Sequence, residues 1–91
     1  MNHRIILDDA ATILNDRDEQ YGSHIECFGR ISQIASGMLG FNVTEYQIAI
    51  ILLAVKLGRM VERPSYIDNY VDGINYLAFA GEFANQTAGE D

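Results

Sequence analysis

Apolar residues recur at three- and four-residue steps along most of this chain, which is the spacing of amphipathic helices. Capping residues and polar stretches divide the pattern into four segments. The four predicted helices cover about Ile5–Asn15, Ser23–Leu39, Thr44–Glu62 and the residues from Ser65 to about Phe83. A charged connection, 16–22, joins the first two helices. We therefore expect an all-α protein.

Local signals mark where these helices begin and end. Ser23 with Glu26, and Thr44 with Gln47, match the capping box, in which two residues satisfy the first free N–H groups of a helix. Gly40 is suited to ending the second helix, because glycine readily adopts the left-handed conformation of a C-cap.

The third segment contains the apolar run Ile48–Val55, whose β-branched residues would also suit a strand. Its length favours a helix, since no glycine or proline occurs between Thr44 and Gly58, whereas strands typically have about five or six residues. This helix is apolar nearly all round and is expected to be the central one. Pro64 ends it, and Ser65 can cap the next helix.

The fourth helix carries two apolar faces. The inward-facing set is expected to be Ile67, Val71, Ile74, Leu77 and Ala78. Tyr76, Phe79 and Phe83 fall on another side, where we expect an interface with a second subunit; the alternative is that this helix is simply well buried. The third and fourth helices are expected to form a central antiparallel hairpin in a compact bundle of about four helices.

Composition indicates one small domain that associates with copies of itself. The chain has 91 residues, of which 48% are hydrophobic. This is more apolar surface than a lone small bundle can easily cover. We expect a single helical domain over residues 1–84, a flexible acidic tail over 85–91, and a homodimer or larger oligomer.

Charge and cysteine content indicate the compartment and the kinds of partner that suit this protein. The formal net charge is −7, which opposes general binding to nucleic-acid backbones. Cys27 is the only cysteine, so no intramolecular disulfide can form. The N-terminal residues lack a signal pattern, and the longest apolar run is too short to span a bilayer. These features predict a soluble cytoplasmic protein without a membrane partner.

Polar residues interrupt the two helices of the predicted hairpin at positions that share a face. They are Lys56 and Arg59 on the third helix, and Asp68, Asp72 and Asn75 on the fourth. In an antiparallel hairpin that turns near position 64, residues whose numbers add to about 128 lie side by side. Lys56 is therefore expected beside Asp72, and Arg59 beside Asp68.

This cluster has two interpretations. In the first, it is an ion-pair network that fixes the register of the hairpin, and Asn75 satisfies a remaining hydrogen bond. In the second, it is the floor of a pocket in which Lys56 and Arg59 hold a phosphate while the carboxylates hold Mg²⁺ or hydrogen-bond donors of a ligand. Both interpretations can hold at once.

A second candidate region lies where the second helix begins, because exposed N–H groups at a helix N-terminus attract anions. Tyr21 can stack there on a base or sugar, with Gly22 and His24 beside it. The structural alternative is that Tyr21 packs on Ile25 and His24 is a solvated surface residue. No GxSxG motif, glycine-rich phosphate loop or HExxH motif is present, so we assign no catalytic residue and no metal ligand.

Three motifs give the chain a resemblance to a known group of proteins. They are R-D-E-Q-Y-G from Arg17 to Gly22, K-L-G-R from Lys56 to Arg59, and D-N-Y-V-D from Asp68 to Asp72. In this order they resemble a family of small phage and prophage proteins of unknown function, over about residues 7–82. The resemblance implies that the protein acts in a phage or prophage context. It also implies that the function depends on six residues, Tyr21, Gly22, Lys56, Arg59, Asp68 and Asp72.

The chain is also distantly similar to the all-helical nucleotide pyrophosphohydrolases of the MazG type, in which an E-x-x-E faces an E-x-x-D to hold Mg²⁺. Here Lys56 and Arg59 take the place of the first acidic pair, and the second motif reads N-Y-V-D from Asn69 to Asp72. Two resident cations oppose the binding of a divalent metal at this position.

Three functional hypotheses follow. The first is a non-catalytic protein that binds a nucleotide or another phosphate-bearing small molecule at the Lys/Arg/Asp cluster. The second is a phage accessory or anti-defence protein whose acidic surface binds a host protein, in the host cytoplasm. The third is a nucleotide pyrophosphohydrolase, and only this hypothesis includes a cofactor, Mg²⁺.

Overall fold

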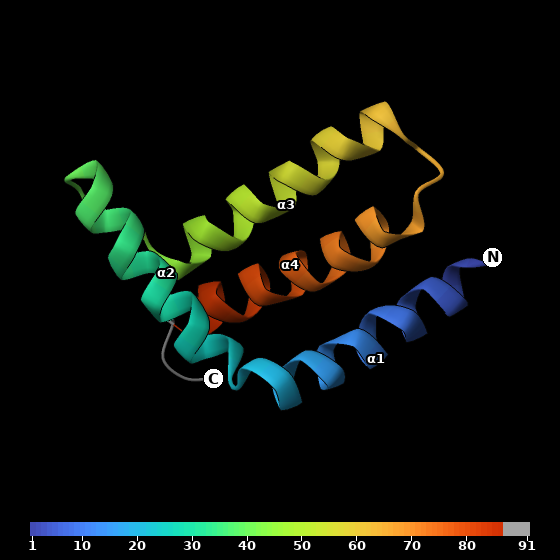
Figure 1. Cartoon of the computed structure of the whole chain (residues 1–91), viewed down its shortest axis with the longest axis horizontal. Helices are drawn as coiled ribbons and strands as arrows, with labels where there is room; N and C mark the ends of the chain where they lie inside the picture. The colour runs from blue at the N-terminus through green and yellow to red at the C-terminus, as the bar shows by residue number, and fades with distance from the viewer. Residues whose placement is uncertain (87–91) are drawn as a thin grey trace.

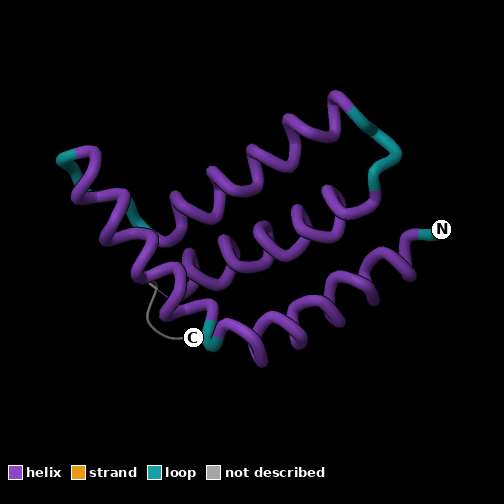
Figure 2. The backbone as a smooth tube through the Cα atoms, viewed as in Figure 1, coloured by secondary structure: helices purple, strands orange, loops and turns teal. Residues whose placement is uncertain are grey.

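The computed structural model describes residues 1–86, except for the side chain of Tyr21. Within this range the chain forms four helices, α1 (His3–Tyr21), α2 (His24–Leu39), α3 (Glu45–Glu62) and α4 (Ile67–Gln86), joined by short loops (Figures 1 and 2). The all-α prediction is confirmed. The predicted tail began at residue 85, but helix α4 continues to Gln86, and residues 87–91 lie outside the described part of the chain.

Helix α1 is longer than predicted at its C-terminal end. The charged stretch expected to be a connection is helical as far as Tyr21, and Gly22 then ends the helix at a φ of 78°. Residues 16–20 are all exposed. Arg, Glu and Gln within this stretch have high helix propensity, so it can extend α1 along the surface without burying charge. At the other end, the Asn2 side chain accepts a hydrogen bond of 3.0 Å from the Ile5 N–H.

The capping signals are confirmed in part. Thr44 and Gln47 form a complete capping box at the start of α3, with bonds of 3.2 and 3.0 Å. Ser23 caps α2 through the Ile25 N–H at 3.1 Å and not through the N–H of Glu26, so the predicted box is not formed there.

The two predicted ends around Gly40 and Pro64 have different outcomes. Gly40 ends α2 in the left-handed conformation, as expected. Pro64 and Ser65 lie in the turn after α3, and α4 begins one residue beyond Tyr66, whose carbonyl accepts a 3.3 Å hydrogen bond from the Asn69 N–H. Ser65 is therefore not the cap of α4.

Helix α4 lies between α1 and α3, so the expectation that the third helix is central was wrong (Figure 1). Helices α3 and α4 form the predicted antiparallel hairpin, and α1 packs on the other side of α4 in the same direction as α4. The burial pattern agrees, since α4 contributes more buried residues than any other described helix. The apolar surface of α3 is consequently covered only where it meets α4 and α2.

The main core forms where α2 crosses the hairpin. Its buried residues are Phe28, Val43, Ile48, Ala49, Ala80 and Phe83, with Tyr76 and Phe79 packed against them. The ring of Phe28 contacts those of Phe79 and Phe83 at centroid distances of 5.3 and 5.4 Å. The aromatic face of α4 predicted to bind a second subunit is therefore covered by α2 of the same chain.

The loop between α2 and α3 is held by hydrogen bonds from serine side chains. The Ser36 hydroxyl accepts from the Val43 N–H at 2.8 Å, and the Ser32 hydroxyl donates to the Val43 carbonyl at 2.5 Å. Val43 itself is only 4% exposed. These bonds satisfy backbone groups that would otherwise be withdrawn from water unpaired. Among the described residues, no helix combines the length and apolar character that crossing a bilayer requires.

Replacing Phe28 with alanine tests this core. We expect a loss of about 3 to 5 kcal/mol in the free energy of unfolding, because the substitution leaves a cavity between two other aromatic rings. Ile34→Ala is the matched control on the same helix, since Ile34 is 63% exposed and its loss should stay within about 0.5 kcal/mol. Urea unfolding followed by circular dichroism measures both. Equal losses in the two variants would contradict the core described above.

Candidate functional site

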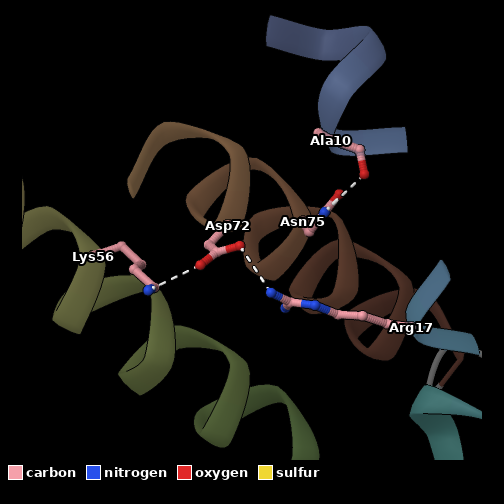
Figure 3. A network of polar contacts seen from close by, with 5 residues as sticks. All are labelled: Ala10, Arg17, Lys56, Asp72 and Asn75. Atoms are coloured by element: carbon pink, nitrogen blue, oxygen red, sulfur yellow. Dashed lines mark hydrogen bonds and ion pairs between the residues drawn. The ribbon is translucent and has the colours of Figure 1, made fainter. Parts of the chain in front are cut away.

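One carboxylate, that of Asp72, contacts cationic side chains from two other helices (Figure 3). Asp72 of α4 accepts from Lys56 Nζ of α3 at 2.9 Å through Oδ2, and contacts an Arg17 guanidinium nitrogen of α1 at 3.5 Å through Oδ1. The side chains of Lys56 and Asp72 are 14% and 13% exposed, whereas that of Arg17 is 52% exposed. We call these three residues the ion bridge. It joins all three helices that run along the length of the molecule.

The antiparallel register predicted from the sequence is confirmed at this point, since Lys56 lies beside Asp72. The contribution of Arg17 was missed. The predicted connection became part of α1, and this extension of the helix carries Arg17 to α4. One signal for it was available, because Arg17 is the first residue of the R-x-x-x-Y-G motif.

Asn75 acts outside the ion bridge. Its Nδ2 donates a 3.0 Å hydrogen bond to the carbonyl oxygen of Ala10 in α1, and both residues are buried. The prediction that Asn75 satisfies a hydrogen bond within the Lys/Asp cluster is therefore corrected. Asn75 instead attaches α1 to α4, one turn along α4 from Asp72 (Figure 3).

A first pocket, the hairpin pocket, lies beside the turn between α3 and α4. It measures about 280 Å³ and is lined by Lys56, Arg59, Glu62, Arg63, Tyr66, Asp68, Asn69 and Asp72. Three of the six Lys and Arg residues of the chain line this pocket. Their charges match those of its three acidic residues, so the rest of the chain carries the whole net charge of −7. An anion therefore meets less repulsion at this pocket than an average position on the acidic surface would give.

Neither arginine of the hairpin pocket, Arg59 or Arg63, forms an ion pair with another described residue. Arg59 and Asp68 line the same pocket, but the structure shows no ion pair between them or from either to another described residue, so the predicted Arg59–Asp68 pair is not formed. Both residues are exposed. Arg63 lies over the ring of Tyr66, with its guanidinium carbon 4.4 Å from the ring centroid. The Arg59 guanidinium is therefore available to a ligand.

A second pocket, the aromatic pocket, lies where α1 ends and α2 begins. It measures about 200 Å³, and its lining includes Phe28, Tyr76 and Phe79 with Arg17, Asp18, Gly22, His24, Cys27 and Asn75. The His24 ring stacks on Phe79 at a centroid distance of 4.5 Å and an interplanar angle of 15°. His24 Nε2 also lies 2.6 Å from Glu82 Oε1. His24 is thus packed and hydrogen-bonded, and the interpretation of a simply solvated histidine was wrong.

The predicted site residues therefore divide between two neighbouring pockets. Lys56, Arg59, Asp68 and Asp72 line the hairpin pocket, and Gly22, His24 and Asn75 line the aromatic pocket. The side chain of Tyr21 lies outside the described part of the structure. The ion bridge connects the two groups, because Asp72 lines the first pocket and its partner Arg17 lines the second.

The acidic residues of the site do not converge as metal ligands do. Within the described part of the chain, no three His, Cys, Asp or Glu side chains are grouped so that they could hold a metal ion. Asp72 instead has a cation on each of its two oxygens. The Asp72 carboxylate is therefore already paired. A ligand in this region would meet the cationic and polar side chains around it.

The fold and the site define a small all-α protein with a charged cluster that links three helices and two adjoining pockets. Residues 5–84 match the family described as "Domain of unknown function (DUF6378)", and the chain belongs to this family. No curated protein and no solved structure matches the chain. The family assignment agrees with the resemblance to a family of unknown function, whereas phage origin and similarity to MazG-type enzymes stay predictions.

The ion bridge can be tested by removing the charge of Asp72. Asp72→Asn leaves the Lys56 ammonium without a counter-ion in a mostly buried position, and we expect a loss of about 3 kcal/mol in unfolding free energy. Arg17→Ala removes the exposed partner and should cost less than about 1 kcal/mol. Denaturant unfolding at neutral pH measures both losses.

A double variant separates pairing from packing at the same position. Lys56→Met combined with Asp72→Leu replaces the ion pair with apolar contacts, and it should recover most of the stability lost in Asp72→Asn. If Asp72→Asn cost no more than Arg17→Ala, the pairing of Asp72 with Lys56 would not be the main interaction at this site.

Proposed function

We propose that this protein is a non-catalytic binding protein for a phosphate-bearing small molecule, of which a nucleotide fits the site best. The hairpin pocket would hold the phosphate, and the aromatic pocket would receive the ring. The observation that carries the proposal is the gathering of Lys56, Arg59 and Arg63 at one pocket of a chain whose net charge is −7.

The arginines of the hairpin pocket have the chemistry for a phosphate. A guanidinium presents a planar fork of N–H donors that matches two phosphate oxygens. Arg59 is exposed and, among the described residues, has no ion-pair partner, so binding would not first have to break a salt bridge. Glu62 and Asp68, which line the same pocket, supply acceptors for hydroxyl groups of a sugar.

The aromatic pocket lies at a suitable distance for the other end of such a ligand. Asp72 and Phe79 line the two pockets seven residues apart on α4, which corresponds to about 10 Å along a helix. Aromatic rings and a few polar groups at the edge are typical of pockets for flat heterocycles. Asn75 Oδ1 and the Asp18 carboxylate can accept hydrogen bonds there, because neither has a hydrogen-bond partner among the described residues.

The other two hypotheses are less well supported by this geometry. A pyrophosphohydrolase needs carboxylates that are free to bind Mg²⁺, and Asp72 already has Arg17 and Lys56 as partners. An accessory or anti-defence protein that binds a host protein would use the acidic surface and would not need the hairpin pocket. A phage setting, with action in the host cytoplasm, is part of the proposal, as is the oligomer expected from the sequence.

A thermal-shift screen tests the proposal directly. The purified protein is titrated with mono-, di-, tri- and cyclic nucleotides and with inorganic pyrophosphate, each with and without Mg²⁺. A ligand present at 100 times its dissociation constant stabilises the fold by about 2.7 kcal/mol, which corresponds to a rise of roughly 10 to 20 °C in Tm for a domain of this size. We expect such a rise without Mg²⁺.

Arg59→Gln is the informative variant, because Arg59 is exposed and no ion pair of the fold depends on it. Loss of a charge-assisted hydrogen bond should weaken binding about 10- to 100-fold while the Tm without ligand stays unchanged. Arg30→Gln removes an exposed arginine of α2 outside both pockets and should bind as the wild type does. An equal loss in both variants, or no shift with any nucleotide, would reject the proposal. A shift that needs Mg²⁺ and is followed by pyrophosphate release would favour the hydrolase.

A further inference from the structure

The outer face of α3 carries exposed apolar residues that the described chain does not cover. Ile51, Leu57 and Val61 are 54%, 51% and 84% exposed. Ile50 and Val55 are 37% and 44% exposed. Helix α3 packs on α4 and α2 within the described chain, and this face points away from both helices. We call it the α3 face, with Ala54 and Gly58 in its middle.

The spacing of the α3 face is that of a helix–helix contact. Ile50, Ala54, Leu57 and Val61 follow one another at steps of four, three and four residues, which is the repeat of a helical seam. Ala54 and Gly58 are exposed and small, and a Cβ atom added to Gly58 would meet nothing within 4 Å. Small residues in the middle of a seam let two helices approach closely, and large neighbours can fill the space.

The extent of the α3 face is large for a protein of this size. Together with Ala54, Gly58 and Tyr46, these residues expose a surface area of roughly 600 Å². This is at the upper end of the apolar patches found on monomers, at about 300 to 600 Å². It is also about three quarters of the 800 Å² or so that each partner contributes to a standard interface.

We propose that the α3 face binds the α3 face of a second copy of this chain, antiparallel about a two-fold axis at Ala54. In that register residues whose numbers add to 108 lie at the same height, and those four or seven residues from Ala54 also lie on its face of the helix. Ile50 of one copy is placed against Gly58 of the other, and Val61 against the aliphatic part of Gln47. The large Ile50 therefore meets a small residue, and Ala54 meets itself at the axis.

Charge decides both the occupant and the direction. Two copies with a net charge of −7 each repel one another over most of their surfaces, but the exposed positions of α3 from 46 to 58 carry no charge. A parallel pair would place Glu62 beside Glu62 of the second copy. The antiparallel pair separates the two Glu62 side chains by about 24 Å along the helices, so they do not repel each other across the contact.

The first test is the mass of the protein in solution. Sedimentation equilibrium of the full chain is expected to give twice the chain mass of 10.2 kDa. Gly58→Glu should leave the helix intact, because space is open at this position and glycine is a poor helix former. It should weaken association by a factor on the order of 100 or more, since a charge would be buried against an isoleucine of the second copy.

A matched control uses another helical glycine. Gly37 of α2 is exposed and has nothing within 4 Å of an added Cβ, so Gly37→Glu should leave the dimer unchanged. Circular dichroism of all three proteins verifies that the helix content is retained. A monomeric wild type, or a dimer that Gly58→Glu does not weaken, would overturn the proposal.

The direction of pairing is tested by disulfide cross-linking in a Cys27→Ser background. The variant with both Ile50→Cys and Gly58→Cys should form a covalent dimer on oxidation, because the two positions face each other in the antiparallel pair. The variant with Ile50→Cys alone should remain uncross-linked, because its two cysteines lie about 12 Å apart along the paired helices. Efficient cross-linking of the Ile50→Cys variant would establish a parallel pair and overturn the antiparallel one.

Discussion

A carboxylate that is mostly withdrawn from water needs a cation, and the position of Asp72 depends on this requirement. Its side chain is 13% exposed, and it receives Lys56 from α3 and Arg17 from α1. Because an uncompensated buried charge is costly, only arrangements that keep at least one of these partners in place are stable. The Lys56–Asp72 pair thus restricts the register of the α3–α4 hairpin, and the longer, exposed contact of Arg17 adds a weaker attachment of α1. The two pockets lie on either side of the ion bridge.

The placement of α4 determines which apolar surfaces are covered. Helix α4 has neighbours on two sides, and its aromatic residues also contact Phe28 of α2. Its aromatic face is therefore used within one chain, whereas Leu77 and Ala78, which were expected to face inward, are exposed. Helix α3 has no third neighbour in the described chain, so residues such as Leu57 and Val61 remain exposed. Part of the high hydrophobic content of the sequence is therefore exposed on α3, and another part on α2, where Ile34 and Met38 are 63% and 78% exposed.

The charges of the site show how an acidic protein can keep a place for an anion. Four of the six Lys and Arg residues, namely Arg17, Lys56, Arg59 and Arg63, line one of the two pockets. Lys56 and Arg17 are used to hold Asp72, whereas Arg59 faces the pocket without an ion-pair partner among the described residues. Structural and binding roles are therefore divided among neighbouring cations, which is why the two interpretations of the cluster are compatible.

Local patterns of this sequence determined the four helices, the capping box of Thr44, the stop at Gly40 and the pairing of Lys56 with Asp72. These features depend on residues close in sequence or on the register of a single turn, so periodicity and spacing suffice to predict them. Tertiary packing decided the rest. It placed α4 in the centre, covered Phe79 with α2, directed Asn75 to Ala10 and brought Arg17 to Asp72 from 55 residues away. Helical periodicity gives the direction of an apolar face along its own helix, but which other helix covers that face depends on contacts between distant segments.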